Sequence, residues 1–134
     1  MTVETDYNNA HLLVKRGDEV IHTFEYKEFV PAIEIQKVQD VKNEIFIIYK
    51  KEASENTQSE LRTAESKYFN ILLSTATTNP ITHEDALKKF SLPEINKISE
   101  EVFTFLVVWS SKAEVKQYGL SLLNQQTEKK NLSG

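Results

Sequence analysis

The chain of 134 residues has no cysteine and only three glycines and three prolines. The absence of cysteine excludes disulfides, Cys-ligated zinc, iron–sulfur clusters and thiol catalysis. The scarcity of Gly and Pro indicates few turns and long regular elements, which favours helices over a many-stranded sandwich. Long apolar runs are missing too, since Phe105–Trp109 is far shorter than the roughly 20 residues that a membrane span needs.

Positive charge is also in short supply. The chain carries 16 Lys and Arg residues against 20 Asp and Glu residues, for a formal net charge of −4. Because nucleic-acid binding needs clustered basic residues that displace counterions, we expect no general affinity for DNA or RNA. The polar, acidic N-terminus has no basic segment followed by an apolar one, so we expect no secretory signal and a cytoplasmic location.

The length and composition, with 40% hydrophobic and 27% charged residues, suit one globular domain. We predict a mainly α fold in which a small N-terminal β-hairpin packs on a four- to five-helix domain over residues 11–123. The predicted elements are a polar arm over 1–10, a hairpin over 11–26, helices over about 32–50, 58–74, 83–90, 93–110 and 112–123, and a flexible polar tail over 124–134.

The hairpin is predicted from two β-prone runs on either side of Gly17-Asp18, a pair typical of a II′-type turn. A lone hairpin is marginal in water, so one of its faces is expected to pack on helices. With Arg16 opposite Glu19, that face holds Leu13, Val20, His22, Phe24 and Tyr26. The other face then holds Leu12, Val14 and Ile21.

Local signals place several helices. Apolar residues recur at steps of three and four from Ile35 to Ile48, which predicts one helical stripe. The β-branched end of this segment, 45–49, also suits a strand, but the stripe enters it in phase, which favours helix. The segments Thr82–Asp85 and Ser91–Glu94 have the spacing of capping boxes, so we predict that helices begin there.

Residues 102–109 are apolar on nearly every side of the helix predicted over 93–110. The stripe that we expect in the core consists of Ile95, Ile98, Val102, Phe105 and Trp109. Phe103 and Val107, four residues apart, lie on another side, with Leu106 between the two groups. Two interpretations stay open: the segment is the central core helix, or Phe103, Val107 and Leu106 form a partner-binding face.

No arrangement of residues indicates catalysis or metal binding. The sequence has no G-x-S-x-G elbow, no P-loop and no G-x-G-x-x-G. His11 and His22 lie diagonally on one face in the predicted register, and His83 stands in the first turn of a helix. A transition metal needs three or four ligands, which these histidines do not supply. We therefore expect no enzyme activity, no metal and no cofactor.

Three segments together resemble the tail assembly chaperones of long-tailed, siphovirus-type bacteriophages. They are the hairpin at 11–26, the polar tail after Leu123, and Thr82–Ile98, in which an acid-rich helix start precedes Ala-Leu-x-x-Phe-x-Leu-x-Glu-Ile. The abundance of Lys, Asn, Ile and Glu suits a phage of a low-GC Gram-positive host. The resemblance is one of pattern over most of the chain. No binding residue carries over, because the family has no invariant motif.

The resemblance implies a cytoplasmic, non-enzymatic protein that binds the aggregation-prone tape measure protein and keeps it soluble during tail assembly. A helical scaffold suits this role, because it can offer an apolar groove to helical segments of a partner. Many copies along one partner gain from weak self-association. We therefore expect a protein partner, the tape measure protein or another tail protein, together with a weak homo-oligomer and no membrane association.

Two other functions stay open. Residues 82–98 also suit the helix-turn-helix of a small phage regulatory nucleic-acid-binding protein. Against this, the second helix begins Pro93-Glu94-Ile95-Asn96-Lys97, which places an acid where phosphate or base contacts are needed. The other function is that of a structural head or tail connector subunit.

Overall fold

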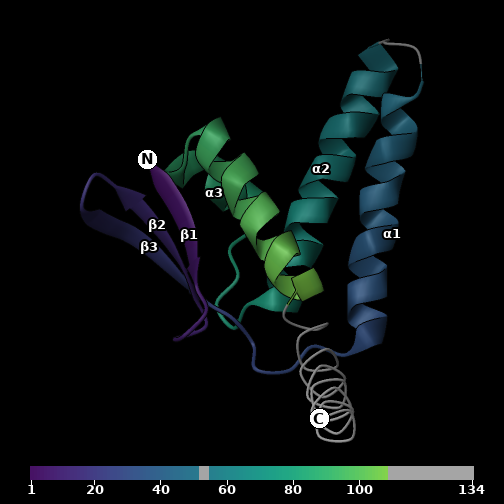
Figure 1. Cartoon of the computed structure of the whole chain (residues 1–134). Helices are drawn as coiled ribbons and strands as arrows, with labels where there is room; N and C mark the ends of the chain where they lie inside the picture. Colours follow the sequence, from purple (N-terminus) through teal and green to yellow (C-terminus); the bar gives the residue numbers. More distant parts are fainter. Residues whose placement is uncertain (52–54, 109–134) are drawn as a thin grey trace, which may run out of the picture.

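In the computed structural model, which describes residues 1–51 and 55–108, a three-stranded sheet packs against helices (Figure 1). The elements are β1 (Thr2–Asp6), β2 (His11–Arg16), β3 (Glu19–Glu25), α1 (Ala32–Tyr49), α2 (Glu55–Ala76), α3 (His83–Lys89) and a helix over residues 92–108. A mainly α fold with a β-hairpin packed on helices is therefore confirmed. The helix predicted over 112–123 and the tail predicted over 124–134 lie outside the described residues.

Residues 1–10 do not form the polar arm that the sequence predicted. Within them, β1 pairs antiparallel with β2 and enlarges the hairpin to a sheet of order β1-β2-β3. Val3 pairs with Val14 and is buried in the core. The side chain of Thr5 also points inward, and its Oγ1 lies 3.1 Å from the hydroxyl of Tyr26. A single inward apolar residue is too short a pattern to reveal a strand, which explains the error.

The hairpin turn forms where the sequence predicts it. Arg16 pairs with Glu19, and Gly17 between them has a φ of +62°. This left-handed conformation strains any residue that carries a Cβ atom, so glycine is the residue that the position requires. Two-residue turns with such a glycine match the right-handed twist of the strands that they join.

A β-bulge changes which face of β2 is buried. The register shifts between Val14 and Lys15. Val14 pairs with His22, whereas the predicted register pairs it with Ile21. A shift of one residue sends the following pairs to the opposite face of the sheet. The predicted buried face is therefore right for Phe24 but wrong on β2, where Leu12 and not Leu13 is fully buried.

The segment 45–49, which also suited a strand, is helical, as the phase of its stripe predicts. Helix α1 ends at Tyr49, one residue before the predicted boundary. Helix α2 is longer at both ends than the predicted 58–74. Its start is polar, yet Glu and Gln are good helix formers, so polarity alone does not mark a break.

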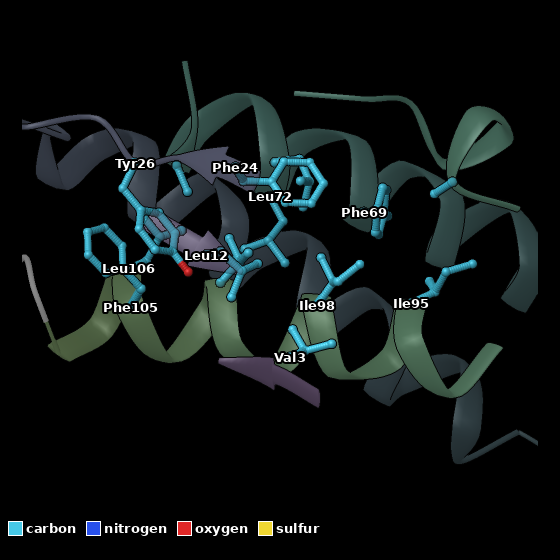
Figure 2. Close-up of a cluster of buried hydrophobic side chains, with 14 of the residues drawn as sticks. Val3, Leu12, Phe24, Tyr26, Phe69, Leu72, Ile95, Ile98, Phe105 and Leu106 are labelled. Atoms are coloured by element: carbon cyan, nitrogen blue, oxygen red, sulfur yellow. The ribbon is translucent and has the colours of Figure 1, made fainter. Parts of the chain in front are cut away.

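The helix over residues 92–108 supplies the centre of the core, as Figure 2 shows. Its Ile98, Val102 and Phe105 are fully buried. The ring of Phe105 stacks on the ring of Tyr26, with centroids 3.5 Å apart and an interplanar angle of 8°. The core-helix interpretation is therefore confirmed for the described residues. Trp109, the last member of the predicted stripe, lies outside them.

The helix start predicted at Thr82 forms with an N-cap, and the capping box predicted at Ser91 forms in full and is also tied to the sheet. Thr82 Oγ1 accepts a hydrogen bond from the Asp85 N–H at 3.2 Å. Ser91 and Glu94 cap each other, through the Ser91 N–H to Glu94 Oε1 at 2.9 Å and the Glu94 N–H to Ser91 Oγ at 3.3 Å. Arg16 donates to both oxygens of the same carboxylate, from Nη2 at 2.8 Å and from Nε at 3.1 Å. This bidentate contact fixes the end of the hairpin to the start of the helix.

The hydrogen bonds from Arg16 to the buried carboxylate hold the pKa of Glu94 at about 2, below its ordinary value of 4.5. The folded protein therefore binds fewer protons than the unfolded chain between these two values. The stability that this carboxylate provides is present above about pH 4.5 and is lost as the pH falls toward about 2.

We predict that Glu94→Gln lowers the free energy of unfolding by about 1–3 kcal/mol at neutral pH, because the hydrogen bonds to a charged acceptor are lost. Urea unfolding followed by circular dichroism measures the effect, and the variant should lose less stability on acidification than the parent chain. Glu100→Gln is the matched control, since Glu100 is exposed on the same helix and its removal should cost less than about 0.5 kcal/mol. Equal losses in the two variants would contradict the prediction.

Candidate functional site

The structure separates the three residues of the predicted partner face. Leu106 is only 1% exposed and belongs to the core, so the prediction that it contacts a partner is wrong. Phe103 is half-buried and packs against the core, and the Lys42 ammonium from α1 lies 3.5 Å from its ring centroid. Val107 is half-buried as well. The helix over residues 92–108 therefore presents no continuous apolar face at these three positions.

Exposed apolar side chains gather instead at the far end of α1. Phe46, Ile47 and Tyr49 are exposed by 62%, 59% and 64%. In Figure 1 this end of α1 and the start of α2 project beyond the sheet and the other helices. The main hydrophobic cluster takes only Ile35 and Val38 from α1, both from its first half. The projecting part of the α1–α2 pair, called the helical hairpin below, therefore carries apolar side chains that the core does not use.

The sequence itself contains a signal for this surface. Residues 45–49 are apolar at five successive positions, so a helix must place some of them outside its buried stripe. Residues 102–108 have a similar apolar excess, but there the core of the chain takes up much of it. An excess of apolar residues in a helix is thus buried where the sheet covers that helix and stays exposed where it does not.

An open groove of about 630 Å³ runs between α1 and α2 in the helical hairpin. Its lining includes the apolar side chains of Ile47 and Ala64. Two ion pairs join the helices along it, Lys67–Glu44 at 3.5 Å and Lys51–Glu60 at 3.3 Å. All four charged side chains are about half exposed, so each pair adds little stability. The pairs nevertheless balance the charge along the groove.

Among the described residues, no group of three or more His, Asp or Glu side chains is placed to hold a metal ion. The β-bulge also separates the two histidines of the hairpin. His22 pairs with Val14 and shares its inward face, whereas His11 pairs with Glu25 on the outward face. These two histidines therefore cannot share one ion, although the predicted register placed them on the same face.

His22 is held between β3 and α3. Its ring contacts the rings of Phe24 and Phe90, with centroids 4.3 and 5.7 Å away. The Nζ atom of Lys89 lies 2.7 Å from Nδ1, and the buried Nε2 has no hydrogen-bond partner in the described part of the chain. Burial and, next, the positive charge of Lys89 lower the pKa of His22. The neutral ring is thus part of the packing between the sheet and α3.

Comparisons with known proteins do not indicate a functional site, so the candidate site is identified from features of the chain itself. No protein family, curated protein or solved structure matches this chain. None of the described helices combines the length and the apolar character that crossing a membrane requires. Within the described residues, the projecting helical hairpin is therefore the best-supported candidate for a functional surface.

The lowered pKa of His22 predicts that stability falls as the pH drops below 6.5, the ordinary value for histidine. Below that pH the unfolded chain binds a proton that the folded chain resists, so folding is penalised. We expect His22→Gln to reduce this fall, as measured by thermal unfolding across that pH range. His11→Gln, on the outward face, should retain it. If the His22 variant lost as much stability on acidification as the parent chain does, this explanation would be contradicted.

Proposed function

We propose that this protein is a non-enzymatic chaperone that binds the tape measure protein of a long-tailed phage and keeps it soluble during tail assembly. One observation carries the proposal: Phe46, Ile47 and Tyr49 stand exposed on a helical hairpin that projects away from the core. Grouped apolar side chains on a projecting element typically mark a protein interaction site. The resemblance to tail assembly chaperones supplies the identity of the partner.

The helical hairpin suits an aggregation-prone helical client. An amphipathic segment can lay its apolar side against the exposed rings of Phe46 and Tyr49. The ammonium of Lys50 lies 4.7 Å from the ring centroid of Phe46, so a basic side chain borders the apolar surface. The client thereby exchanges water for apolar contact, while the charged groups at the border stay solvated.

The size of this surface suits weak, repeated binding. Complete burial of one such side chain contributes roughly 1.5–3 kcal/mol, and the entropic cost of association offsets much of the total. A single copy is therefore expected to bind weakly and reversibly. Many copies along one long client would together keep its apolar segments covered, and each could leave when the tail tube subunits arrive.

The alternative of a nucleic-acid-binding regulator is less well supported. In that interpretation, the helix over residues 92–108 would enter the major groove with its first turn. Glu94, in that turn, is buried and bound by Arg16, so the charge of this arginine is already neutralised. Ile95 is buried as well. The helix start therefore lacks the positive charge that phosphate contacts need.

Gene order separates the chaperone from a connector subunit. We expect a tail tube gene upstream of the gene for this chain and a very long reading frame, encoding the tape measure protein, downstream. A neighbourhood of head or connector genes without that long frame would contradict the proposal.

We predict that changing both Phe46 and Tyr49 to Ser leaves the free energy of unfolding within roughly 1 kcal/mol, because both side chains are mostly exposed. The same variant should lose the ability to keep the co-expressed downstream tape measure protein in the soluble fraction. The matched control changes Phe29 and Ile33 to Ser, since these are exposed by 77% and 58% near the start of α1.

The control variant is expected to keep the client as soluble as the parent chain does. An unchanged soluble fraction with the Phe46 and Tyr49 variant would count against the helical hairpin as the binding surface. An equal loss with both variants would show that general surface hydrophobicity, and not this site, is responsible.

A further inference from the structure

The two edges of the sheet differ. The outer edge of β3 is covered by the segment that follows α2. There, Asn79 accepts a hydrogen bond from the Glu25 N–H at 2.8 Å and donates one to the Thr23 carbonyl at 3.0 Å. The Thr78 N–H donates to the Glu25 carbonyl at 2.8 Å. This part of the edge therefore has its backbone groups satisfied from within the chain, which blocks pairing with another strand.

Among residues 1–51 and 55–108, no segment covers the edge formed by β1 in this way. Apart from its pairing with β2, β1 makes no backbone–backbone hydrogen bond to another described residue. Alternate peptide groups of an edge strand point away from the sheet and remain available for a further strand. The side chains of β1 follow the expected alternation, with Val3 buried and Glu4 exposed. Within the described part of the chain, the edge is thus regular and its outer peptide groups have no backbone partner.

A groove of about 390 Å³ lies beside this edge, between β1 and the helix over residues 92–108. Its lining includes Thr2, Val3 and Glu4 from the strand and Pro93, Asn96 and Glu100 from the helix. At the other end of β1, Thr5 Oγ1 donates to Glu101 Oε2 at 3.2 Å, which holds the strand close to the helix. The groove therefore provides space beside the free edge, with a helix as its second wall.

We propose that this edge is a binding site at which an extended basic segment of another protein adds to β1 as a fourth strand. Backbone hydrogen bonds to β1 provide most of the affinity in this mode of recognition, and alternate side chains provide the selectivity. The inward side chains of the segment are small and apolar, because they lie beside Val3 and Pro93. Its outward side chains are basic, because they lie opposite Glu4.

The charges along the edge select this occupant. The edge carries four carboxylates and two lysines. Lys15 pairs with Glu4, and Lys97 pairs with both Glu100 and Glu101. The fourth carboxylate is that of Asp6. Opposite charges directly across two strands stabilise the pairing, and like charges destabilise it. A lysine or arginine opposite Glu4 therefore strengthens the added strand, whereas an acid there weakens it.

The same carboxylate disfavours a second copy of this chain as the occupant. An antiparallel arrangement that pairs all five residues of β1 with those of a copy puts Glu4 opposite Glu4. Edge strands commonly carry charge for this reason, since the repulsion prevents edge-to-edge aggregation. The acid thus disfavours self-pairing and at the same time favours a basic partner strand.

The test uses the full chain and a short fluorescent synthetic peptide in which lysine and valine alternate. Fluorescence anisotropy should show that it binds at least about tenfold more tightly than a peptide with glutamate in place of lysine. Methylation of alternate backbone nitrogens of the lysine peptide should weaken binding by about tenfold or more, because the strand hydrogen bonds are lost. Absence of binding, or binding indifferent to methylation, would overturn the proposal.

Matched variants locate the site. Glu4→Lys should weaken the binding of the lysine peptide by about tenfold and strengthen the binding of the glutamate peptide. Glu19→Lys makes the same charge change at the exposed start of β3 and should leave both affinities nearly unchanged. If Glu4→Lys disturbs the fold, Glu4→Gln tests the same point with a smaller expected loss. Equal effects at Glu4 and Glu19, or a dimer of the free protein with protected β1 amides, would overturn the proposal.

The proposal is independent of the helical hairpin on α1 and α2. Loss of peptide binding in the Glu4 variants should leave client solubility unchanged, because Phe46 and Tyr49 lie on another element. Failure of the strand-addition test therefore leaves the chaperone proposal intact, and failure of the chaperone test leaves the edge site intact.

Discussion

A sheet of three short strands cannot bury its apolar face alone, and the rest of this fold depends on how that face is covered. The helix over residues 92–108 lies against it and buries Ile98, Val102 and Phe105. The two ends of this contact are held by different physical means. At the helix start, the buried carboxylate of Glu94 binds Arg16 from the hairpin, and near its other end Phe105 stacks on Tyr26.

This arrangement determines which apolar residues remain available for a partner. The helix over residues 92–108 has apolar side chains on several sides, but the core and α1 take up Leu106 and much of Phe103. The sheet is too small to reach the second half of α1, so the apolar excess at 45–49 stays in solvent. In the proposed function, the client contacts therefore lie on an element whose exposed side chains are not part of the core.

The features that the sequence predicted well depend on local chemistry. The N-cap at Thr82 and the capping box at Ser91 need residues only three positions apart, and the turn at Gly17 needs one glycine. The bounds of α1 follow from a stripe whose period persists over the whole segment 32–49. Such signals lie within a few residues of the structure that they predict, so one sequence is enough to find them.

The features that the sequence did not predict depend on distant partners. Strand β1 exists because β2 offers it a register, and its own pattern has one inward apolar residue, Val3. The bulge after Val14 changes the register of the hairpin, and no local residue pattern predicts it. The contact between Arg16 and Glu94 joins residues 78 positions apart. The burial of Leu106 likewise depends on which side of its helix the sheet covers.

Hydrogen exchange of the free chain, resolved by residue, tests most directly whether residues 92–108 form the core and the far end of α1 an exposed surface. Amides over 95–106 should exchange only through global unfolding and should be among the slowest in the chain. Amides over 44–50 should exchange at least about tenfold faster, through local opening of the helical hairpin. If the two segments exchange at equal rates, or if 95–106 exchanges faster, the division between a buried helix and an exposed hairpin is wrong.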